Sequence, residues 1–126
     1  MIPNIGVWEM SNKNLFPLSN HEASMVIRMI INGDTDDALK FMSTFYHIDP
    51  PKSVIGLPRN KCFKAYACYV PSKHTIYFRD AESFRNPYIV LHEFYHVIRS
   101  AGGKHKGTEK YADEFAKKFI QYALTL

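Results

Sequence analysis

The order of sequence patterns along the chain restricts the fold more than any other feature. Two segments with helical spacing of apolar residues come first, residues 53–79 are rich in β-branched and aromatic residues, and two further helical segments follow. Short strands that follow one another closely usually pair antiparallel, and helices grouped outside such a sheet pack over one of its faces. The sequence therefore predicts an α+β fold, with a small antiparallel sheet packed against helices.

The first two predicted helices carry clear start and stop signals. Ser19 is a helix cap, Glu22 completes a capping box with it, and Gly33 ends the helix. The second helix begins at Asp34 or Thr35, either of which can act as its cap, and ends before two consecutive prolines.

Three candidate strands lie between residues 53 and 79, separated by Pro, Gly, Asn and Ser. Their sequences are SVIGLPR, CFKAYACYV and HTIYFRD, and TIYF is the clearest strand. Cys62 and Cys68 both belong to the second segment. If that segment is one strand, the two side chains project from one face about 20 Å apart, which is too far for a disulfide. We therefore expect reduced thiols in the core.

Length and composition fit a single domain that covers residues 1–126. The chain is 46% apolar, lacks a run of roughly 18 apolar residues that could span a membrane, and lacks an export signal at its start. We expect a cytoplasmic protein that does not bind membranes. The net charge of +4 is modest, so we rank nucleic-acid binding last among the functions considered. That function would use Lys104, Lys106, Lys110, Lys117 and Lys118.

The third predicted helix carries the residues that indicate chemistry. It is expected to begin with Asn86 as cap and Pro87 in the first turn, and it contains the sequence His92-Glu93-Phe94-Tyr95-His96. Two histidines four positions apart project from one helix face and can bind the same metal ion. Glu93 is rotated roughly 100° from His92, so its carboxylate can reach a water molecule on the metal.

A catalytic zinc ion usually has three protein ligands and one open position, so a further ligand is expected downstream. Glu109, at the start of the last predicted helix, is the candidate, and Asp113 lies one turn later on the same face. A carboxylate in that position can accept the second N–H of a zinc-bound histidine and orient its ring. We therefore expect Zn²⁺ on His92, His96 and Glu109, with Asp113 as the supporting carboxylate.

Other assignments remain open at this stage. His105 follows a glycine turn and is a rival third ligand, and Glu114 competes with Glu109 but has no carboxylate four residues later. A pattern of five residues also arises by chance, in which case His92 and His96 would be core histidines.

The pattern H-E-x-x-H followed by E-x-x-A-D-x-F-A from Glu109 resembles the gluzincin metallopeptidases related to thermolysin. More narrowly, it resembles the ImmA/IrrE family and the compact minigluzincins. The resemblance implies a zincin-like fold with a motif helix and a glutamate helix, and zinc held by His92, His96 and Glu109. It also implies that Glu93 is the catalytic base and that a strand edge binds the substrate backbone.

These observations predict a zinc-dependent endopeptidase that hydrolyses a protein or peptide substrate laid along the edge of Thr75–Phe78. Glu93 would assist the attack of zinc-bound water and pass the proton to the leaving amine. Tyr77 and Tyr95 are candidate donors to the developing oxyanion. The alternative is a module of the same fold that holds zinc but is latent or non-catalytic. The sequence makes no prediction of the oligomeric state.

Overall fold

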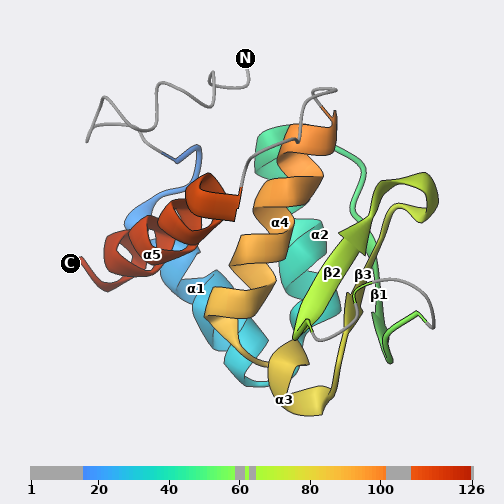
Figure 1. The fold of residues 1–126 in the computed structure, drawn as a ribbon. Coiled ribbons are helices and arrows are strands. Elements are labelled where there is room, and N and C mark those ends of the chain that lie inside the picture. Colours follow the sequence, from blue (N-terminus) through green and yellow to red (C-terminus); the bar gives the residue numbers. More distant parts are fainter. Residues whose placement is uncertain (1–15, 59–61, 63–64, 102–108, 126) are drawn as a thin grey trace.

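The computed structural model describes residues 16–58, 62, 65–101 and 109–125, which form five helices, a 3-10 turn and three strands (Figure 1). The α+β class predicted from the sequence is confirmed. In chain order the elements are α1 (Asn20–Ile31), α2 (Thr35–Tyr46), β1 (Lys52–Ile55), β2 (Ala67–Val70), η2 (Pro71–Lys73), β3 (Thr75–Phe78), α3 (Ala81–Phe84), α4 (Pro87–Ala101) and α5 (Glu109–Leu124).

The sheet is mixed, so the prediction of an antiparallel sheet was wrong for one of its two strand pairs. Its strand order is β1-β3-β2, with β1 parallel and β2 antiparallel to β3. β3 follows β2 in the sequence after the turn at η2, and it lies between β1 and β2 in the sheet. β3 therefore has a partner on both sides, and the predicted substrate strand Thr75–Phe78 has no free edge.

One face of the sheet packs against the helices. Strand register places Ala67 opposite Phe78 and Tyr69 opposite Ile76, and these side chains point toward the helices. Cys68 and Tyr77 are paired on the other face, because successive side chains alternate between faces. Figure 1 shows α4 between α5 and the sheet, with β2 as the strand nearest to it. This arrangement puts β2 beside the helix that carries the two histidines.

The predicted helix starts of α1 and α4 are confirmed by their hydrogen bonds. Ser19 and Glu22 form both bonds of the capping box, at 3.0 and 2.8 Å. The Asn86 side chain accepts hydrogen bonds from the backbone N–H groups of Tyr88 and Ile89, at 3.0 and 3.2 Å. These bonds satisfy donors that the first turn of a helix leaves without partners, and they set where α4 begins.

Apolar residues at helical spacing form most of the core of α4 and α5. Ile89 and Ile120 are only partly buried. The residues with this spacing that are buried are Val90, Phe94, Val97, Ile98, Ala112, Phe115, Ala116, Phe119 and Ala123. Within the described part of the chain, no helix combines the length and the apolar character needed to cross a lipid bilayer.

The expectation of two reduced thiols was wrong, because Cys62 and Cys68 form a disulfide with their Cα atoms 5.7 Å apart. The error came from treating residues 62–70 as one strand. Among the described residues of this segment, Ala67–Val70 is the strand, whereas Cys62 has a left-handed backbone conformation (φ 62°) and its carbonyl accepts a hydrogen bond from the N–H of Ala65. The chain therefore turns at Cys62 and brings the two sulfur atoms together.

The disulfide predicts a measurable dependence of stability on reductant. Replacing both cysteines by serine (C62S/C68S) should lower the free energy of unfolding by about 2 kcal/mol, because the unfolded chain loses a short covalent loop. Reductant should destabilise the wild type to a similar extent in urea unfolding and leave the double variant unchanged. An equal response of both proteins to reductant would show that the bond does not form in solution.

Candidate metal centre

Helix α4 presents His92 and His96 on the side that faces α5. The two rings lie one turn apart with their centroids 5.1 Å from each other, and both side chains are mostly buried. This geometry follows from their spacing, since residues four apart lie on the same face of a helix. The two imidazoles therefore point into one site.

The carboxylate of Glu109, in the first turn of α5, meets both histidines. Its Oε1 is 2.9 Å from Nε2 of His92, and its Oε2 is 3.1 Å from Nε2 of His96. One ligand atom from each of the three residues lies within 4.8 Å of the others, so the group could hold a metal ion. The Glu109 side chain is 78% exposed, which means that burial does not hold it in place.

Asp113 lies one turn after Glu109 on α5 and contacts the other nitrogen of His92. Its Oδ1 is 2.9 Å from Nδ1 of His92. The same oxygen accepts a hydrogen bond of 2.6 Å from the hydroxyl of Tyr88. This bond, followed by the nearby His92, holds the pKa of Asp113 below its usual range despite an opposing effect of burial. His92 thus has a carboxylate oxygen at each of its ring nitrogens.

Tyr88 is a further residue of this site, and the sequence motif does not include it. Its hydroxyl donates to Asp113, which together with burial raises the pKa of Tyr88 to about 12. The phenol therefore keeps its proton near neutral pH. A signal was present in the spacing, because Tyr88 precedes His92 by four residues on the same helix just as Glu109 precedes Asp113.

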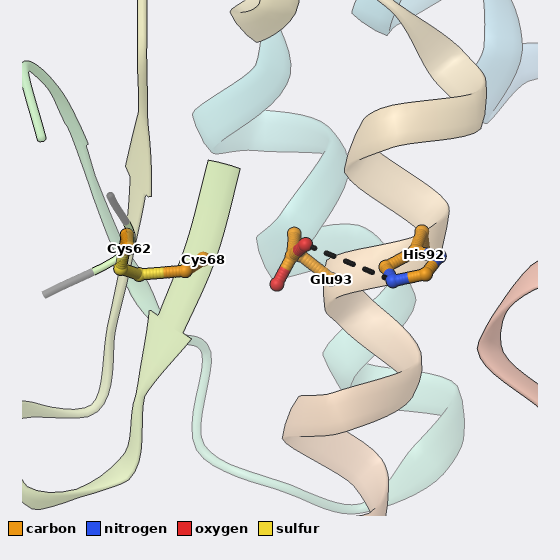
Figure 2. Close-up of a disulfide and its surroundings, with 4 residues drawn as sticks. All are labelled: Cys62, Cys68, His92 and Glu93. Atoms are coloured by element: carbon orange, nitrogen blue, oxygen red, sulfur yellow. Dashed lines mark ion pairs between the residues drawn. A yellow bond between two sulfur atoms is a disulfide. The ribbon is translucent and has the colours of Figure 1, made fainter. Parts of the chain in front are cut away.

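Glu93 projects from α4 on the side that faces β2, and its carboxylate lies beside His92. Figure 2 shows its carboxylate between the His92 ring and β2, with the disulfide on the far side of that strand. Its Oε2 is 4.0 Å from Nε2 of His92, and Glu93 as a whole is only 7% exposed. Glu93 therefore stands next to the candidate metal ligands without belonging to them.

Burial raises the pKa of Glu93 to about 7, and burial is the largest cause of this shift. The carboxylate of Glu109 also raises the pKa, whereas His92 and a hydrogen bond from the backbone N–H of Tyr69 lower it. A carboxyl group with this pKa can both accept and release a proton near neutral pH.

A cavity of about 520 Å³ joins the histidines to β2. One wall is β2 with the residues that flank it, and the opposite wall is formed by α4 and α5. The residues that line it are Ala65, Tyr66, Ala67, Cys68, Tyr69, Pro71, Tyr88, Ile89, His92, Glu93, His96, Glu109 and Asp113. The candidate ligands and Glu93 are thus accessible from a single cavity that is bordered by a strand.

Several other candidates from the sequence lie elsewhere. Tyr95 is a core residue with 1% exposure, and Tyr77 lies on the face of the sheet that points away from the helices. Neither of them lines the cavity. Among the described residues Glu114 does not belong to the candidate metal group. His105 lies outside the described residues.

Comparisons with protein family models, with curated proteins and with solved structures gave no match for this chain.

Proposed function

We propose that the protein is a zinc-dependent endopeptidase of gluzincin type, with α4 as the motif helix and α5 as the glutamate helix of a zincin-like fold. One observation carries the proposal. His92, His96 and Glu109 converge on one point, and the buried carboxylate of Glu93 lies beside them in a cavity bordered by a strand.

The donor atoms fit a catalytic zinc site. Such sites commonly use three protein ligands and leave one position open for water or substrate. Two imidazole nitrogens and one carboxylate oxygen make up the group here, and the cavity gives access to them. Asp113 adds the carboxylate that frequently orients a zinc-bound histidine.

Glu93 supplies the proton transfers in the proposed reaction. A zinc ion held by the three ligands would polarise the peptide carbonyl and lower the pKa of a coordinated water molecule to about 7. Glu93, 4.0 Å from His92, accepts the proton of the attacking water and then donates it to the nitrogen of the departing amine. Its position beside the ligand group, and not within it, supports this role over metal binding.

The substrate backbone is proposed to bind along β2, which replaces Thr75–Phe78 in this role. Among the described residues, β2 pairs with β3 and with no other strand. The carbonyl of Tyr66 accepts a hydrogen bond from the N–H of Arg79, which extends the pairing with β3. Because backbone groups alternate in direction along an antiparallel pair, those of Ala67 and Tyr69 point outward, and the Tyr69 N–H does reach Glu93. An extended peptide can pair with such a free edge.

Metal removal tests the proposal. The purified protein should contain one zinc ion per chain, and a fluorescent casein substrate should be hydrolysed. Treatment with 1,10-phenanthroline should abolish hydrolysis, and one equivalent of zinc should restore it, because the metal polarises the bond that is cleaved. Hydrolysis that persists after complete zinc removal would contradict the mechanism. One zinc per chain without hydrolysis of casein or a mixed peptide library would favour the non-catalytic alternative.

The proposed location is the cytoplasm, as expected from the sequence. Disulfides are rare in the cytosol of most organisms, so the redox state of Cys62 and Cys68 in cells tests this part of the proposal. A protein recovered fully oxidised from cells lysed in an alkylating agent would argue for an oxidising compartment.

A further inference from the structure

Tyr88 connects the two helices of the candidate metal centre. It lies in the first turn of α4, one turn before His92, and its hydroxyl donates to Oδ1 of Asp113 on α5 at 2.6 Å. The same oxygen lies 2.9 Å from Nδ1 of His92. A single carboxylate oxygen is thus held by two groups that come from consecutive turns of the other helix.

Asp113 needs such a restraint because its side chain is 46% exposed. A single hydrogen bond at an exposed position contributes little to fixing a side chain, since water competes for both partners. A second donor on the same oxygen removes the freedom of the carboxylate to rotate away from His92. The Tyr88 ring itself is packed, with its centroid 6.3 Å from that of His92.

We propose that Tyr88 is a positioning residue of the metal centre, whose hydroxyl holds Asp113 so that Asp113 orients the ring of His92 toward Glu109. The inference rests on the proposed zinc function. It assigns to Tyr88 a role that passes through Asp113, with no direct contact to the metal. Tyr88 also lines the cavity, so a direct contact with the substrate is the competing role that the experiment must separate.

The test compares Tyr88→Phe with Tyr111→Phe, a matched control on α5 whose ring is exposed and lies outside the cavity. Zinc affinity is measured by competition with a chromophoric chelator. Removal of a group that orients a ligand typically weakens metal binding about 10–100-fold, and we expect Asp113→Ala to fall in this range. Tyr88 acts on His92 through Asp113, so Tyr88→Phe should weaken zinc binding by a smaller factor, about fivefold. Tyr111→Phe should leave zinc binding unchanged.

A double-mutant cycle separates a role through Asp113 from an independent one. If Tyr88 acts through Asp113, Tyr88→Phe should have no further effect on zinc affinity in the Asp113→Ala background. Equal losses in both backgrounds would overturn the proposal. An unchanged zinc affinity combined with a raised KM for peptide would also overturn it and assign Tyr88 to the substrate.

A measurement on the metal-free protein keeps this inference distinct from the zinc function. In ¹⁵N NMR of the histidine rings, the Nδ1 proton of His92 should be protected from exchange by Asp113, and Tyr88→Phe should increase its exchange rate severalfold. An unchanged rate in Tyr88→Phe would overturn the positioning role even if zinc binds normally. A changed rate in a protein that does not bind zinc would support the positioning role and contradict only the proposed function.

Discussion

Replacement of Glu93 by glutamine is expected to lower the rate of peptide hydrolysis by about 10²–10⁴-fold, the usual contribution of a positioned acid–base group. Glutamine keeps the shape of the side chain but cannot accept the proton of the attacking water or pass it to the amine. Zinc content should remain one per chain, since Glu93 lies beside the ligand group and does not belong to it. The measurement is kcat for a fluorogenic peptide together with metal analysis of the same sample.

Glu114→Gln is the matched control for this experiment. Glu114 lies on α5, outside both the cavity and the candidate metal group, so its substitution should leave kcat and zinc content unchanged. Hydrolysis by Glu93→Gln at the wild-type rate would eliminate Glu93 as the base. Loss of zinc together with activity would instead place Glu93 among the ligands.

The pH dependence of stability is a separate test of whether Glu93→Gln folds and whether the Glu93 carboxyl group is buried. In the metal-free protein, burial raises the pKa of Glu93 to about 7, above its usual value of 4.5. The folded protein therefore keeps a proton that the unfolded chain releases, and the wild type loses stability as the pH rises from about 4.5 to 7. Glutamine does not ionise, so the variant lacks this loss. The free energy of unfolding should be measured in urea at pH 5 and pH 8. Between these pH values, its value for the variant minus its value for the wild type should rise by up to about 3 kcal/mol.

Substitution of Glu109 by alanine is expected to have the second large effect, a loss of zinc affinity of more than about 100-fold. This estimate exceeds the effect of removing an outer group because a direct ligand is lost. His92 and His96 would remain as a pair of nitrogens without the carboxylate that now meets both of them. Zinc affinity and stoichiometry should be measured by chelator competition, with hydrolysis recorded in parallel.

The exposure of Glu109 makes this result easy to interpret. Its side chain is 78% exposed, so its removal should change the unfolding free energy of the metal-free protein by no more than about 0.5 kcal/mol. Glu114→Ala on the same helix is the control and should bind zinc normally. If Glu109→Ala retained wild-type affinity, the third ligand would lie elsewhere, and His105→Ala would be the next variant to measure.

Local patterns in the sequence were sufficient for the four longer helices and for much of the candidate site, whereas the short helix α3 was not predicted. Ser19 with Glu22 and Asn86 before Pro87 mark helix starts through contacts within one turn. The four-residue spacing of His92 and His96 fixes their common face as soon as α4 forms. Such features depend on neighbours in sequence, so they are readable without knowledge of the fold.

The sheet could not be predicted to the same extent. Each candidate strand was found, but Cys62, Ala65 and Tyr66 were wrongly included in one, and the left-handed backbone at Cys62 was not foreseen. Strand order depends on the path of the connections, and short strands give no local signal of which partner they will take. Thr75–Phe78 is therefore the central strand, and the edge strand that lies against α4 is Ala67–Val70.

The sequence by itself determined which residues can meet on one helix face: His92 with His96 on α4, and Glu109 with Asp113 on α5. Only the tertiary structure decided that these two faces meet, with Glu109 reaching both histidines and Asp113 held between His92 and Tyr88. The physical reason is the range of the interactions. Helical spacing acts over one turn, whereas the packing of α4 on α5, the pairing of β2 with β3 and the closure of the disulfide join residues whose approach depends on the path of the chain between them.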